Sequence, residues 1–75
     1  MGDIIVTVRT KKSEVDLKLS GTRQVGVLLK DLGVALGIDV SSTARMQAEP
    51  AGKILNNQQS LLEQDIYNGS VLTII

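Results

Sequence analysis

Residues 66–75 read IYNGSVLTII, and the predicted architecture follows from this segment. Its Asn68-Gly69 dipeptide is a strong turn signal, and the six residues that follow are mostly apolar and β-branched, as a strand requires. Strict alternation places Leu72 and Ile74 on the same side of that strand. We therefore predict a turn followed by a strand that lies in the middle of a sheet, with Leu72 and Ile74 facing the core.

Two strands and a helix precede this stretch. Residues 4–9 (IIVTVR) and 14–19 (EVDLKL) alternate apolar with other side chains, and the polar segment between them is short enough for a hairpin loop. The period then becomes helical, with apolar residues on one stripe at Val25, Leu28, Leu29, Leu32 and Leu36. Thr22 is the expected N-cap and Gly37 the expected left-handed residue after the helix.

The remaining segments are short. Residues 44–49 (ARMQAE) are predicted as a strand with Met46 and Ala48 inward, residues 50–53 as a turn, and residues 53–55 as a very short strand. Residues 60–66 favour a helical turn that buries Leu61 and Ile66. A right-handed crossover would place the final strand beside the first and parallel to it. We predict one α+β domain over residues 1–75: a β-grasp fold, with one amphipathic helix packed on one face of a mixed sheet.

The composition excludes several functions. Eight basic and eight acidic residues cancel, and Tyr67 is the only aromatic residue, which argues against nucleic-acid binding. The absence of Cys and His removes the conventional activated nucleophile and thiol or imidazole metal sites. We expect no enzyme activity and no catalytic, cofactor-binding or metal-ligating residues. No apolar run approaches the ~20 residues of a membrane span, so a cytoplasmic protein is expected.

Residues 51–75, AGKILNNQQSLLEQDIYNGSVLTII, are similar to the corresponding part of ubiquitin without a gap, and the upstream hairpin and helix match in order and spacing. The resemblance covers essentially the whole chain and implies the ubiquitin-like form of the β-grasp fold. Ubiquitin and the related sulfur carriers act through a flexible tail that ends in Gly-Gly, whereas this sequence stops at Ile75. Glu49, followed by Pro50, occupies the position of a key isoleucine in ubiquitin's recognition patch. We therefore expect neither conjugation nor binding by ubiquitin receptors.

The segments IIVTVR, VDLKL and LLEQDIYNGSVLTII together resemble the YukD/EsaB family, small cytoplasmic components of type VII (WXG100/Ess) secretion systems in Gram-positive bacteria. This resemblance implies a non-enzymatic accessory or regulatory protein that is required for secretion. We expect it to bind membrane or ATPase subunits of that machinery non-covalently, as a monomer or weak homodimer. Two alternatives stay open. One is a sulfur carrier or covalent modifier that lacks its Gly-Gly tail in this sequence, and the other is a ubiquitin-like docking domain of a larger secretion component.

The sheet face without the helix is the expected protein-binding surface, because it combines apolar residues with a polar rim. The alternative is that its β-branched residues reflect only the preferences of strands. The predicted surface consists of Ile5, Thr7, Arg9, Arg45, Gln47, Glu49, Val71, Thr73 and Ile75.

A second candidate surface is the outer side of the helix, at Val27 and Val34. The small-residue band Gly26, Gly33 and Gly37 would let a partner backbone approach there, unless these glycines are simply tolerated by a helix that packing stabilises. Lys11 and Lys12 at the hairpin tip would either keep that turn soluble or contact an acidic partner or an anionic membrane surface.

Overall fold

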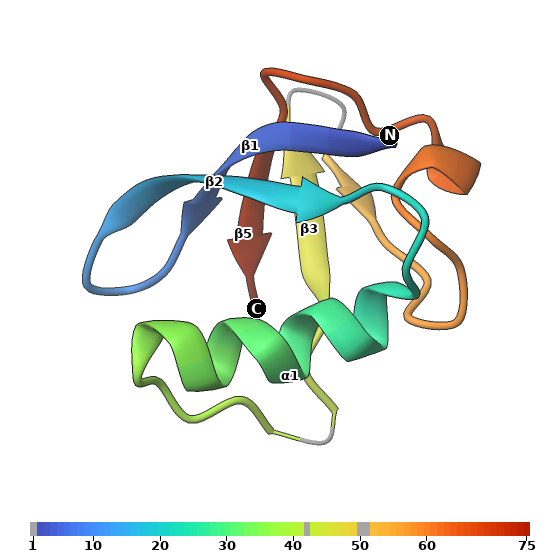
Figure 1. The fold of residues 1–75 in the computed structure, drawn as a ribbon. Helices are drawn as coiled ribbons and strands as arrows, with labels where there is room; N and C mark the ends of the chain where they lie inside the picture. The colour runs from blue at the N-terminus through green and yellow to red at the C-terminus, as the bar shows by residue number, and fades with distance from the viewer. Residues whose placement is uncertain (1, 42, 50–51) are drawn as a thin grey trace.

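The central position of the last strand is the main feature of the fold in the computed structural model, which describes residues 2–41, 43–49 and 52–75. The elements are β1 (Asp3–Arg9), β2 (Glu14–Ser20), α1 (Val25–Leu36), β3 (Met46–Glu49), β4 (Lys53–Ile54), a 3-10 turn η1 (Leu62–Gln64) and β5 (Val71–Ile74). The sheet order is β2-β1-β5-β3-β4, with β5 parallel to β1 and antiparallel to β3 (Figure 1). The predicted β-grasp fold is confirmed.

One face of the sheet carries the core, and α1 packs across it (Figure 1). The predicted inward residues of the strands and the predicted helical stripe meet there, with Leu36 and Ile74 half-buried at its margin. The fully buried large side chains are Met46, Leu55, Leu61, Leu72, Val6, Val8 and Val25. A continuous apolar core of this kind is what allows a chain of 75 residues without disulfides to fold.

The Asn68-Gly69 turn attaches the start of β5 to β1. The side-chain oxygen Oδ1 of Asn68 accepts a hydrogen bond from the Ile5 N–H at 2.8 Å, and the Gly69 N–H donates to the Ile5 carbonyl at 2.9 Å. Gly69 has a φ of 90°, a conformation that glycine adopts without steric cost. The turn predicted from the sequence is therefore confirmed. It also fixes where β5 begins against its parallel neighbour.

The start of α1 differs from the prediction. Thr22 is not the N-cap; Gln24 occupies that position and its side chain makes no capping hydrogen bond. The first helical N–H groups are instead satisfied by a distant loop, because Val25 N–H donates to the Gln59 carbonyl and Gly26 N–H to the Asn57 carbonyl, both at 2.9 Å. A helix whose first donors are paired by tertiary contacts needs no capping side chain.

The helix glycines serve this internal packing and do not form a band open to a partner. A Cβ added at Gly26 would lie 3.2 Å from the Asn57 carbonyl oxygen, and one at Gly33 would lie 3.0 Å from Cγ2 of Val40. The prediction that Gly26 and Gly33 could admit a partner backbone is therefore wrong, since the chain's own loops occupy that space. Gly37 ends the helix in the left-handed region, with a φ of 65°, as predicted.

The loop that caps α1 is itself held by a buried glutamine. Gln64 accepts a hydrogen bond from Asn56 N–H at 2.7 Å through Oε1. Its Nε2 donates to the carbonyl oxygens of Asn56 at 2.9 Å and Ser60 at 3.2 Å. Leu61 and Ile66 are buried on either side of this residue, so the predicted helical turn over residues 60–66 is confirmed. In the predicted turn over residues 50–53, Pro50 and Ala51 lie outside the described residues.

Ser60 and Glu63 form a capping box before this turn. Ser60 N–H donates to the Glu63 carboxylate at 2.9 Å, and Glu63 N–H donates to the Ser60 hydroxyl at 3.1 Å. The Ser-x-x-Glu spacing is visible in the sequence. Hydrogen bonds from Ser60 lower the pKa of Glu63 below its ordinary value of 4.5. The bond from the Ser60 N–H has the larger effect on this pKa, and the bond from the Ser60 side chain has the smaller.

Glu63 should therefore stabilise the fold in a pH-dependent way. A carboxylate whose pKa is lower in the folded state contributes its full stabilisation above the unfolded pKa of 4.5 and loses it as the pH falls through the folded pKa. We expect Glu63→Gln to be less stable than the wild type at neutral pH, with the difference shrinking below pH 4.5. Urea unfolding of both proteins across this range measures it. A difference that is the same at acidic and neutral pH would contradict the assignment.

Candidate functional site: the open sheet face

The face of the sheet opposite α1 brings all nine predicted surface residues together. The strand register places Val71 between Thr7 and Glu49. It likewise places Thr73 between Arg9 and Gln47. Residues that are neighbours in register point to the same side of a sheet, so these six share one surface.

The ends of this surface are Ile5 and the pair formed by Arg45 and Ile75. Arg45 and Ile75 exchange two backbone hydrogen bonds, at 3.2 and 2.9 Å, which continue the β3–β5 ladder by one residue. Ile5 and Ile75 each expose 56% of their surface. We call the surface formed by these three residues and the six residues in register between them the open face.

Three polar side chains of the open face form hydrogen bonds with neighbouring residues. Thr7 Oγ1 donates to Asp16 Oδ1 at 2.7 Å, and Arg9 Nε donates to Glu14 Oε1 at 3.2 Å. Gln47 Nε2 donates to the carbonyl of Gly52 at 3.4 Å. These contacts restrict the side chains before any partner binds, so that less conformational entropy is lost on association.

The open face is wider than the sequence analysis predicted. Asp16 and Lys18 on β2 lie in register with Thr7 and Ile5, which extends the surface past β1. On the other side, Ile54 is paired with Gln47 and is 51% exposed. The signal for Ile54 was present, because it alternates with its buried neighbour in the KIL segment.

The chemical character of this surface is mixed. Its exposed apolar side chains, Ile5, Ile54 and Ile75, are separated by the polar side chains of three strands, and Val71 between them is half-buried. Within residues 2–41, 43–49 and 52–75, no group of three or more His, Cys, Asp or Glu side chains could hold a metal ion. Such a surface is suited to contact with another protein through both apolar area and paired charges.

The second candidate surface consists of two valines. Val27 is 40% exposed and Val34 is 86% exposed on the outer side of α1, as predicted. Because Gly26 and Gly33 face the chain's own loops, these valines have no flat small-residue surface beside them. Isolated exposed valines are ordinary on a protein surface, so the open face is the stronger candidate.

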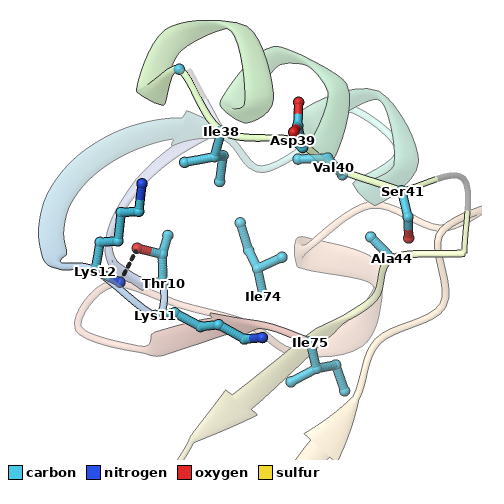
Figure 2. Close-up of a pocket in the computed structure, with 11 residues that line it drawn as sticks. Thr10, Lys11, Lys12, Ile38, Asp39, Val40, Ser41, Ala44, Ile74 and Ile75 are labelled. Carbon is cyan, nitrogen blue, oxygen red and sulfur yellow. Dashed lines mark hydrogen bonds between the residues drawn. The ribbon is translucent and has the colours of Figure 1, made fainter.

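A cleft of about 440 Å³ lies beside the end of the open face, between the hairpin tip and the loop after α1. Figure 2 shows Ile38 and Ile74 pointing toward one another across it, with Lys11 and Lys12 on the hairpin side. Thr10 Oγ1 accepts hydrogen bonds from the N–H groups of Lys12 and Ser13, both at 3.2 Å, which fixes the tip. The lysines thus flank a cleft whose lining is both polar and apolar, and their contact with an acidic partner stays a prediction.

Comparison with protein-family models matches residues 3–74 to YukD, described as a protein of the WXG100 protein secretion system (Wss). A search of curated proteins by sequence gave no significant match.

Several solved structures share the fold. One is the ubiquitin-like domain of the Mycobacterium tuberculosis type VII secretion system protein EccD1, with a TM-score of 0.78 and 23% identity, covering 100% of this chain and 99% of that one. Ubiquitin from Caldiarchaeum subterraneum has a TM-score of 0.78 and 16% identity, over 99% and 92% of the two chains. A structure concerned with molecular mimicry of SUMO in DNA repair has a TM-score of 0.84 and 16% identity, over 100% and 92%.

Proposed function

This chain belongs to the YukD family of the WXG100 protein secretion system, and we propose that it serves that system as a non-enzymatic, cytoplasmic accessory protein that binds other components non-covalently through its open face. The match to the YukD family is the evidence for a role in this secretion system. Among the described residues, none of the helices has the length and hydropathy that a membrane span requires.

The observation that carries the binding role is the asymmetry of the sheet. One face is covered by α1 and forms the core, while the open face keeps Ile5 and Ile75 exposed on the same surface as Arg9, whose side chain bonds to Glu14. The ubiquitin-like domain of EccD1 supports the proposal at the level of fold, because a type VII secretion protein of Mycobacterium tuberculosis contains the same architecture. Fold alone does not determine function, so the surface must be tested directly.

The partners that we propose are membrane or ATPase subunits of the secretion machinery. The test is affinity capture from the organism that encodes the protein, comparing the wild type with the double variant Thr7→Glu plus Val71→Glu. These two residues are adjacent in register at the centre of the open face, beside Asp16 and Glu49. Two further carboxylates there would make the centre strongly acidic and costly to bury against a partner.

We expect the wild type to recover secretion subunits and the double variant to recover about tenfold less, as for substitutions at the centre of an interface. Val34→Glu on the outer side of α1 is the matched control and should recover as much as the wild type, since Val34 is 86% exposed on the opposite side. Equal recovery by the double variant would remove the open face from the proposal, and loss with Val34→Glu alone would move the site to the helix.

A further inference from the structure

We infer that β2 is a self-pairing edge, through which two copies of this chain associate antiparallel about a two-fold axis at Leu17. The inference stands apart from the secretion role, although Asp16 and Lys18 of this strand also border the open face. The sheet order leaves β2 at one edge with seven residues, whereas β4 at the other edge has two. β2 also contains no proline. A long, regular edge strand is a template for pairing with another strand.

The hydrogen bonds at the two ends of the hairpin show which backbone groups of β2 point outward. Thr10 N–H donates to the Ser13 carbonyl at 2.8 Å, and Gly21 N–H donates to the Gly2 carbonyl at 2.7 Å. In an antiparallel pair, every second residue directs its backbone groups to the partner strand. Counting by twos from either end, the odd-numbered residues of β2 bond to β1. The outward residues are then Glu14, Asp16, Lys18 and Ser20.

The charges on β2 are complementary to a second copy of the same strand. With the axis at Leu17, Asp16 lies opposite Lys18 of the second copy, and the symmetry repeats this pair. These are outward residues, so each pair is also joined by backbone hydrogen bonds across the interface. An axis at Asp16 would pair Lys18 with Glu14, but it would place Asp16 against Asp16 and leave Leu19 opposite Ser13. An axis at Lys18 would place Lys18 against Lys18. Opposite charges directly across a strand pair stabilise it and like charges destabilise it, so the register about Leu17 is favoured over these two.

The apolar side of β2 fits the same register. Leu17 would face Leu17 of the second copy, and Val15 would face Leu19, on the side of the sheet that carries α1. A groove of about 490 Å³ runs between β2 and α1, lined by Leu17, Leu19, Leu28 and Leu32 among others. Leu17 and Leu19 are half-buried in the single chain, and the second copy would cover them.

The partner that fits this edge is therefore a second copy of the chain. A two-fold interface requires a surface that is complementary to itself, and β2 meets this requirement in charge, in apolar side chains and in backbone groups at once. An unrelated extended peptide would satisfy the backbone groups, but it would not need the matched positions of Asp16 and Lys18 about Leu17.

Sedimentation equilibrium from micromolar to millimolar concentration tests the inference. The average mass of the wild type should rise from 8.0 kDa toward twice that value. Amide hydrogen exchange on the same samples should show protection that grows with concentration at Asp16 and Lys18, and not at Leu17, whose N–H already bonds to β1. A monomer at millimolar concentration, or protection that grows on another strand, would overturn the inference.

Charge exchange provides matched variants. Asp16→Lys and Lys18→Asp each place like charges opposite one another twice, so each should weaken the dimer about tenfold or more. The combined variant restores opposite charges and should recover the dimer. Each of the three variants loses the exposed contact of Asp16 with Thr7, that of Lys18 with Asp3, or both. Their unfolding is therefore measured at low protein concentration, where the chain is a monomer. Failure of the combined variant to recover, with folding intact, would overturn the register.

Discussion

Leu72→Ala is expected to lower the free energy of unfolding by about 3–4 kcal/mol, within the range for replacing a buried leucine with alanine. Leu72 is fully buried on β5, and the register places it between Val8 and Ala48. For a chain of 75 residues the total stability is about 4–11 kcal/mol, so much of it would be lost. Thermal and urea unfolding measure the effect.

The control for this variant is Ile54→Ala, which removes a side chain of similar size from a site that is 51% exposed. It should cost less than about 1 kcal/mol, since exposed residues contribute little to stability. If the two variants lost the same stability, β5 would not be the central strand that the fold requires.

Gly21→Ala is expected to destabilise the fold by about 2–3 kcal/mol through overpacking. A Cβ at this position would lie 2.7 Å from Cγ of Leu62 and closer still to the carbonyl oxygen of Gly2. Gly21 also donates to that carbonyl at 2.7 Å and accepts from Leu62 N–H at 3.0 Å, so neither neighbour can move without straining a hydrogen bond. Urea unfolding of the variant measures the loss.

Gly37→Ala separates this steric effect from a conformational one. Gly37 has a φ of 65° and nothing within 4 Å of the added Cβ, so alanine there is disfavoured only by the left-handed backbone, at about 1 kcal/mol. Gly21→Ala should therefore cost clearly more than Gly37→Ala, although Gly21 does not have a positive φ. The reverse order would contradict the close packing of Gly21 against Leu62.

The features that the sequence predicted well are those that depend on local pattern. Asn68-Gly69 and the alternation through Leu72 located β5, and the helical stripe identified the residues that cover the sheet. The open face followed from the same alternation, because β1, β3 and β5 direct every second residue away from the core. Local pattern therefore predicted both the fold and the position of the candidate surface.

The features that the sequence did not predict depend on contacts between distant segments. Thr22 looked like a helix cap, but carbonyls of residues 57 and 59 satisfy the first donors of α1. Gly26 looked like part of an open band, but Asn57 lies against it. The match of Asp16 to Lys18 across a two-fold axis became apparent only when the structure placed β2 at the sheet edge. In each case the deciding partner lies far away in the sequence or in another copy.

We propose that this YukD-family protein supports secretion through its open face. The most direct measurement is export of WXG100 proteins by a strain lacking the gene, complemented with the wild type, with Thr7→Glu plus Val71→Glu, or with Val34→Glu. Protein levels and unfolding of each variant are checked in parallel. We predict that the wild type and Val34→Glu restore export and that the double variant, although folded, does not. Full export with the double variant would contradict the claim.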